Sequence, residues 1–93
     1  MNIIWKVKSR KVMGDYIALN WLEKDLSPEF GIKKGEVWVR EDWWNDETKR
    51  KRLRVHESVE INLRIRDHLS YTRAHEIANE FEHVAMKHIE GRR

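Results

Sequence analysis

The sequence predicts an α+β domain in which a small antiparallel β-sheet is followed by an antiparallel two-helix hairpin. Before residue 41, apolar and polar residues alternate with the period of two that is typical of strands. After residue 45, the apolar residues recur every three or four positions, as in amphipathic helices. A chain of 93 residues can bury one modest core, so we expect a single domain over residues 1–93.

Three strands are expected within about residues 3–41. The first is predicted at 3–8, where the alternation begins at Trp5. The segment 16–22 is compatible with a strand or a short helix, and its aromatic and β-branched residues favour a strand. The alternation at 36–41 predicts the third strand. Turn residues around Pro28 separate the last two strands, and we expect antiparallel connections.

Two long helices are predicted at about 46–66 and 71–90. The segment 45–47 (Asn-Asp-Glu) supplies a capping residue and first-turn acids for the first helix. Ser70 is a suitable N-cap for the second helix, and Gly91 is suited to its C-cap. The short connection between the helices makes them antiparallel neighbours. The predicted core-facing residues of the second helix follow helical spacing: Ala74, Ile77, Ala78, Phe81, Val84, Ala85 and Ile89.

A potential metal site lies where the two helices face each other. His56 and Glu60 are i, i+4 neighbours on one face of the first helix. Counted from the connection, His75 on the second helix lies level with Glu60. Two imidazoles and one carboxylate form the ligand set of many catalytic zinc sites, which keep a fourth position for water. The sequence therefore predicts His56, Glu60 and His75 as metal ligands, with zinc, Mn²⁺ and Fe²⁺ compatible with these ligand types.

Three further residues are predicted to assist the ligands. Glu57 follows His56 directly, and there it can serve as a general base for a metal-bound water. Asn79 and Glu82 lie one and two turns beyond His75, where they can support the ligands through hydrogen bonds.

A resemblance to a known family is carried by the strand at 36–40, the helical motif His-Glu-Ser-Val-Glu at 56–60 and a ligand on the next helix. This arrangement resembles the zincin metallopeptidases, and most closely their smallest members, the minigluzincins. The family motif is His-Glu-x-x-His, with a glutamate ligand on the following helix. Here the motif ends in Glu60 and the following helix supplies His75, so the ligand types are exchanged between the helices. The resemblance covers about residues 36–82.

The resemblance also implies individual roles. His56 would be a metal ligand, Glu57 the catalytic base, and Val37–Val39 the edge strand that pairs with the substrate. We therefore expect a metal-dependent hydrolase of the zincin type that acts on peptides.

The alternative is a small non-enzymatic binding protein in which the His/Glu cluster is structural and His75 bonds Glu60 directly. The basic run at 49–54 follows Trp43 and Trp44, a combination that can hold phosphates and stack on a base. Acidic neighbours make a solvated helix face the preferred interpretation of this run, so nucleic acid is not the expected partner. A protein partner anchored by the tryptophans is a further possibility.

The amino-acid composition excludes several kinds of site and protein class. The chain has no cysteine, which excludes disulfides and thiolate metal sites. It has no apolar run near the ~20 residues of a membrane span, so a cytoplasmic protein without a membrane partner is expected. Charged residues make up 38% of the chain and glutamine is absent, a bias that resembles that of thermophile proteins.

Overall fold

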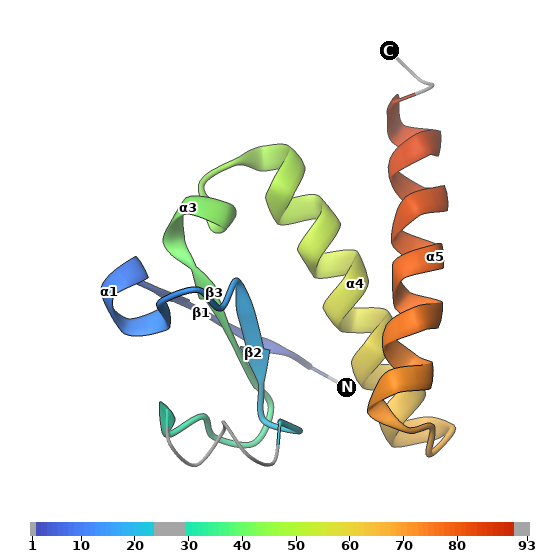
Figure 1. The fold of residues 1–93 in the computed structure, drawn as a ribbon, viewed down its shortest axis with the longest axis horizontal. Coiled ribbons are helices and arrows are strands. Elements are labelled where there is room, and N and C mark those ends of the chain that lie inside the picture. Colours follow the sequence, from blue (N-terminus) through green and yellow to red (C-terminus); the bar gives the residue numbers. More distant parts are fainter. Residues whose placement is uncertain (1, 24–29, 91–93) are drawn as a thin grey trace. The chain divides into compact units, whose positions relative to one another are not determined.

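The computed structural model describes residues 2–23 and 30–90 and confirms the α+β class (Figure 1). The chain divides into two compact units, residues 1–50 and 51–93. The first unit contains a three-stranded sheet with short helices, and the second contains most of the two long helices. The boundary between the units falls within the first of these long helices.

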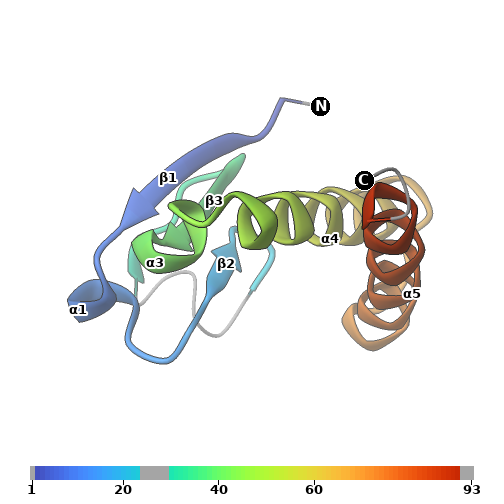
Figure 2. The same ribbon diagram turned by 90° about the horizontal axis from the view of Figure 1, so that it is seen from above.

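The sheet consists of β1 (Ile4–Lys8), β2 (Ala18–Asn20) and β3 (Glu36–Arg40) in the order β1-β3-β2 (Figure 2). β3 pairs antiparallel with β2, as expected, but it pairs parallel with β1. The prediction of a purely antiparallel sheet is therefore wrong for one of the two strand pairs. β3 enters between the two earlier strands, which run in opposite directions, so it is parallel to one of them. This position gives the backbone groups of β3 partners on both sides.

The central position of β3 also overturns a role that the family resemblance implied. Val37 and Val39 are fully buried, and β3 is paired along both of its edges. The expectation that Val37–Val39 forms an edge strand open to a substrate is therefore wrong. A strand with two paired edges has no free row of backbone donors and acceptors to offer a peptide.

Residues 1–50 bury an apolar cluster together with the polar side chains of Asn20 and Arg40. The buried residues Met13, Leu19 and Ile32 form a cluster, and the partly buried side chains packed against it are Trp21, Phe30 and Trp38. Met13 ends the short helix α1 (Arg10–Met13), whose N-cap is Ser9. The short helix α3 (Glu41–Trp44) follows β3 directly. The predicted turn at Pro28 lies outside the described residues.

The two long helices are α4 (Glu47–Arg66) and α5 (Tyr71–Glu90), in agreement with the predicted ranges. The N-cap predicted at Ser70 is confirmed, and within the predicted capping segment 45–47 it is Asp46 that caps α4. The backbone N–H of Lys49 donates to Asp46 Oδ1 at 3.0 Å, and that of Arg73 donates to Ser70 Oγ at 3.2 Å. The proposed C-cap, Gly91, lies outside the described residues. In the part of the chain that the structure describes, no helix combines the length and the apolar character that crossing a membrane requires.

The buried face of α5 differs in part from the predicted stripe. Ala74 and Ala78 are fully buried as expected, but Phe81 and Val84 are 57% and 67% exposed, so their assignment to the core is wrong. Met86 is buried in addition. Polar side chains of α5 occupy part of the face between the helices, because His75 and Glu82 lie at hydrogen-bonding distance from side chains of α4. The side chain of Ile89 lies outside the described set.

Candidate metal centre

α4 and α5 bring His56, Glu60 and His75 together. His56 Nε2 lies 2.9 Å from Glu60 Oε2 and 3.2 Å from His75 Nδ1, and these last two atoms are 3.1 Å apart. One donor atom from each residue therefore occupies one corner of a compact triangle. A group of this composition and spacing can hold a metal ion. The convergence that the sequence predicted for these three side chains is present.

Exposure differs sharply across the three side chains. The side chain of Glu60 is 2% exposed, that of His56 is 12% exposed, and that of His75 is 41% exposed. The carboxylate therefore lies deepest, and the cluster opens toward solvent at His75. A site that is closed on one side and open on the other can admit a small ligand without unfolding the helix pair.

The environment shifts the pKa values of two members of the cluster in opposite directions. The hydrogen bond to Glu60 raises the pKa of His56 above its ordinary value, although burial opposes this, and the charges of Glu57, Glu60 and Glu82 add to the increase. Burial alone would raise the pKa of Glu60, but its hydrogen bonds with His56 and His75 outweigh burial and lower it. Both shifts have the same cause, because the contact between His56 and Glu60 stabilises the charged form of each group.

The donor triangle fits a small divalent ion. Three tetrahedrally arranged ligands at 2.0–2.1 Å from a zinc ion are separated from one another by about 3.3 Å. The observed separations of 2.9–3.2 Å are only slightly shorter, so a small outward movement of the side chains would accommodate the ion. Imidazole nitrogen and carboxylate oxygen are the ligand types that zinc and neighbouring first-row metals bind.

Behind His56 lies a second layer of polar contacts. Its other ring nitrogen, Nδ1, is 3.1 Å from Glu82 Oε2, and Arg52 Nε donates to Glu82 Oε1 at 2.9 Å. Glu82, which the sequence analysis proposed as a supporting residue, thus lies beside a candidate ligand, whereas Arg52 was not singled out. Arg52 lies one turn before His56 on α4, so helical spacing could have placed it on the same face.

The ring of His75 is held by aromatic contacts. Tyr71 stacks on His75 with a centroid separation of 5.3 Å and an interplanar angle of 20°. The guanidinium of Arg64 lies 5.5 Å from the centre of the Tyr71 ring. The rings of His56 and His75 meet edge to face at 4.7 Å. Tyr71 precedes His75 by four residues, which explains how one helix face can supply both rings.

The other two predicted site residues lie outside the triangle. Glu57 is buried on α4, close enough for its charge to raise the pKa of His56, but it is not one of the three converging donors. Asn79 is exposed on α5, and none of the hydrogen bonds that connect the cluster involves it. Of the two proposed supporting residues on α5, Glu82 is the one that lies at hydrogen-bonding distance from a candidate ligand, His56.

The basic run at 49–54 makes contacts within the chain. Lys49 Nζ lies 5.3 Å from the centre of the Trp43 ring, and the Arg50 guanidinium lies 5.8 Å from that of Trp44. Arg50 also donates to the backbone carbonyl of Trp44 at 3.0 Å. The cations and tryptophans that suggested a nucleic-acid surface are thus partly used in contacting each other.

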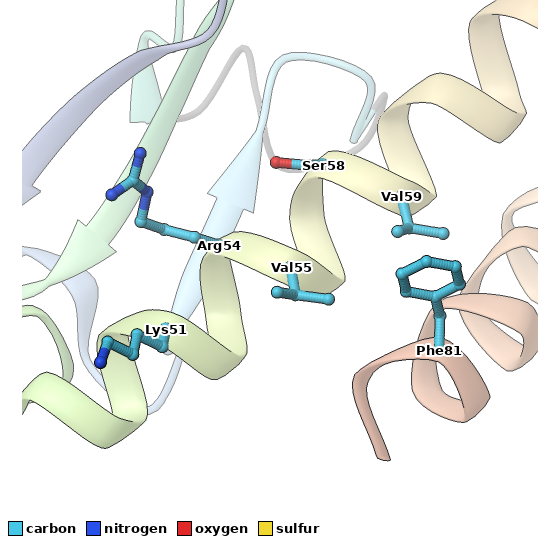
Figure 3. A pocket seen from close by; sticks show the side chains of 6 residues that line it. All are labelled: Lys51, Arg54, Val55, Ser58, Val59 and Phe81. Atoms are coloured by element: carbon cyan, nitrogen blue, oxygen red, sulfur yellow. The ribbon is translucent and has the colours of Figure 1, made fainter. Parts of the chain in front are cut away.

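Residues 51–93 also contain an open groove of about 470 Å³ (Figure 3). Figure 3 shows the ring of Phe81 on α5 close to Val59 on α4. Val55 and Val59 each precede a candidate ligand by one residue, so they project about 100° away from it around the helix. The groove therefore lies on a different side of α4 from the donor triangle. Its lining residues are Lys51, Arg54, Val55, Ser58, Val59 and Phe81.

Comparisons of the chain with protein-family models, curated proteins and solved structures gave no match.

Proposed function

We propose that this chain is a zinc-dependent hydrolase of the zincin type, with His56, Glu60 and His75 as the metal ligands. The observation that supports this most strongly is the donor triangle, with separations of 2.9–3.2 Å between two imidazole nitrogens and a carboxylate oxygen. The carboxylate of Glu82 behind His56 is a second feature that metal-ligating histidines commonly have.

The exposure of the cluster supports catalysis rather than a closed structural site. Structural zinc sites have four protein ligands, whereas catalytic sites have three and leave one position open. Here three donors converge, and the half-exposed His75 leaves one side accessible. A zinc ion held by these three residues would supply Lewis-acid chemistry and would lower the pKa of a water molecule to about 7, which is the chemistry that hydrolysis of a carbonyl compound requires.

The roles of the protein side chains follow from their charges and positions. Glu60 supplies the one negative ligand, and the two imidazoles must be neutral to bind the ion. We assign Glu57 as the group that accepts a proton from the attacking water, because it follows His56 and its charge acts on that ring. The choice of a peptide as substrate rests on the likeness of the motif at 56–60 to the zincin motif. β3 contributes nothing to that choice, since both of its edges are paired.

Metal analysis and peptide hydrolysis together test this proposal. Protein purified without added metal should contain about one equivalent of zinc, and His75→Ala should lose it. His83→Ala is the matched control, because His83 is an exposed histidine on the same helix. Glu57→Gln should keep the metal while hydrolysis falls by ~10²–10⁴-fold, whereas Glu60→Gln should lower metal occupancy.

Two results would contradict specific parts of the proposal. If Glu57→Gln removes zinc as readily as Glu60→Gln, the role of Glu57 as a base is wrong. If the wild type holds stoichiometric zinc but cleaves no member of a broad peptide library, the metal site is real and the hydrolase assignment is wrong.

A non-enzymatic structural cluster is the second candidate, and one observation favours it. The three donor atoms already lie at hydrogen-bonding distance from one another, so hydrogen bonds can stabilise the cluster without a metal ion. On this alternative, the wild type and His75→Ala would show the same lack of bound metal after zinc is offered.

A further inference from the structure

We propose that Arg52 is a positioning residue of the metal centre. It acts through Glu82 to keep a proton on Nδ1 of His56, which presents Nε2 of the same ring to the ion. This inference rests on the proposed function, because it concerns how one ligand of that site is prepared.

The contacts form a chain in which each atom has a distinct partner. Arg52 Nε donates to one carboxylate oxygen of Glu82 at 2.9 Å, and the other carboxylate oxygen lies 3.1 Å from Nδ1 of His56. Because its two oxygens have separate partners, the carboxylate is fixed at both ends. Its orientation toward the imidazole therefore depends on the arginine.

Two carboxylates compete for the protons of His56. Glu60 lies 2.9 Å from Nε2, and Glu82 lies 3.1 Å from Nδ1. A neutral imidazole has one N–H, and the nitrogen that binds a metal must be the one without it. Contact with Glu60 alone would favour the proton on Nε2, which is the wrong nitrogen for binding. An ionised and correctly oriented Glu82 favours the proton on Nδ1 and resolves this competition.

Exposure identifies Arg52 as the adjustable part of this arrangement. The side chain of Arg52 is 49% exposed, whereas those of Glu82 and His56 are 15% and 12% exposed. Replacing Arg52 therefore removes an outer contact without opening a cavity in the interior. It leaves the carboxylate of Glu82 free to turn away from the imidazole, with Glu60 still in place at Nε2.

The test is to compare Arg52→Ala, Arg52→Lys and Glu82→Gln with the wild type by nitrogen-15 NMR of the His56 ring and by zinc titration. Glu82→Gln should weaken zinc binding by about 10–100-fold, and Arg52→Ala by about 3–10-fold, because it acts one contact further away. Both variants should weaken or lose the hydrogen-bonded Nδ1–H signal. Arg52→Lys keeps the charge and should recover part of that signal and of the affinity.

Arg73→Ala provides the matched control. Arg73 also pairs with a glutamate, Glu76, at 3.4 Å, but both side chains are largely exposed and lie outside the cluster. If Arg52→Ala and Arg73→Ala have the same Nδ1–H signal and the same zinc affinity, the positioning role is overturned. A wild type that binds no zinc would instead refute the proposed function, while the ring signals of the metal-free protein would still test the contact through Glu82.

Discussion

Residues 1–50 and 51–93 place different kinds of side chain in their interiors. The first unit buries an apolar cluster around Met13 and Leu19. Its ion pair between Arg40 and Asp42, at 2.6 Å, joins a buried arginine to an aspartate whose side chain is 41% exposed. The second unit buries a carboxylate, Glu60, against the imidazole of His56. Both units bury apolar side chains, but the buried carboxylates among the described residues, Glu57 and Glu60, lie in the second unit. The stability of the second unit therefore also depends on how buried negative charge is satisfied.

The aromatic residues allow the two units to be observed separately. All five tryptophans belong to the first unit, and the candidate ligands belong to the second: Trp5, Trp21, Trp38, Trp43 and Trp44, against His56, Glu60 and His75. Tryptophan fluorescence consequently reports on residues 1–50. Histidine ring NMR and amide exchange in α5 report on residues 51–93.

The largest expected difference between the units is their response to zinc. Free zinc at about 1,000 times its dissociation constant stabilises a binding-competent fold by about 4 kcal/mol. Amide exchange in α5 around His75 should slow by the factor that corresponds to this free energy. Exchange in β3 around Val39 should slow much less. Leu19→Ala, which opens the apolar core of the first unit, should leave the zinc affinity unchanged. Equal protection of both segments by zinc would contradict the distinction between the units.

The same distinction explains which features the sequence could predict. Helix ranges and caps depend on local spacing and on single side chains such as Ser70, and these predictions were correct. The capping segment 45–47 was also predicted, and the structure identifies Asp46 as the residue in it that caps α4. The meeting of His56, Glu60 and His75 followed from helical geometry and a short connection, which are also local properties. Within both units, therefore, the accurate predictions concern residues whose positions follow from one helix or one turn.

The incorrect predictions depend on contacts between elements distant in the sequence. Nothing in the alternation at 36–40 indicates that β3 inserts between two earlier strands, since a central strand and an edge strand share the same period. The rotation of α5 was misjudged because Phe81 and Val84 were assigned to its inner face by helical spacing alone. In the structure, His75 and Glu82 take part of that face, and Phe81 is displaced toward solvent.

A smaller and pH-dependent effect should distinguish the metal-free second unit. The pKa of His56 is raised from its ordinary 6.5, so its contribution to stability is present below pH 6.5 and is lost as the pH rises through the folded-state value. The pKa of Glu60 is lowered from 4.5, so its contribution is present above pH 4.5 and is lost as the pH falls through the folded-state value. In the metal-free protein, the amides of α5 should therefore be best protected against hydrogen exchange between pH 4.5 and pH 6.5.

Zinc should reverse the pH dependence of α5 protection above pH 6.5. The ion binds neutral imidazole, so protons compete with it, and the stabilisation by zinc should grow as the pH rises above 6.5. Amide exchange measured from about pH 5 to 8 should show that the protection of α5 falls with rising pH in the metal-free protein and rises with pH when zinc is present. If the metal-free protein instead gains protection at α5 as the pH rises past 6.5, the ion pair between His56 and Glu60 does not contribute as described.

The smallest expected effect tests the corrected orientation of α5. Val84 is 67% exposed, so Val84→Ala should change the free energy of unfolding by no more than about 0.5 kcal/mol, with any gain due to the higher helix propensity of alanine. Ala78 is fully buried, and Ala78→Leu should destabilise by about 1–3 kcal/mol through overpacking. Urea unfolding followed by circular dichroism measures both. A loss of about 2 kcal/mol for Val84→Ala would mean that this side chain is buried, and the apolar stripe inferred from the sequence would then describe α5 better than the polar face centred on His75 and Glu82.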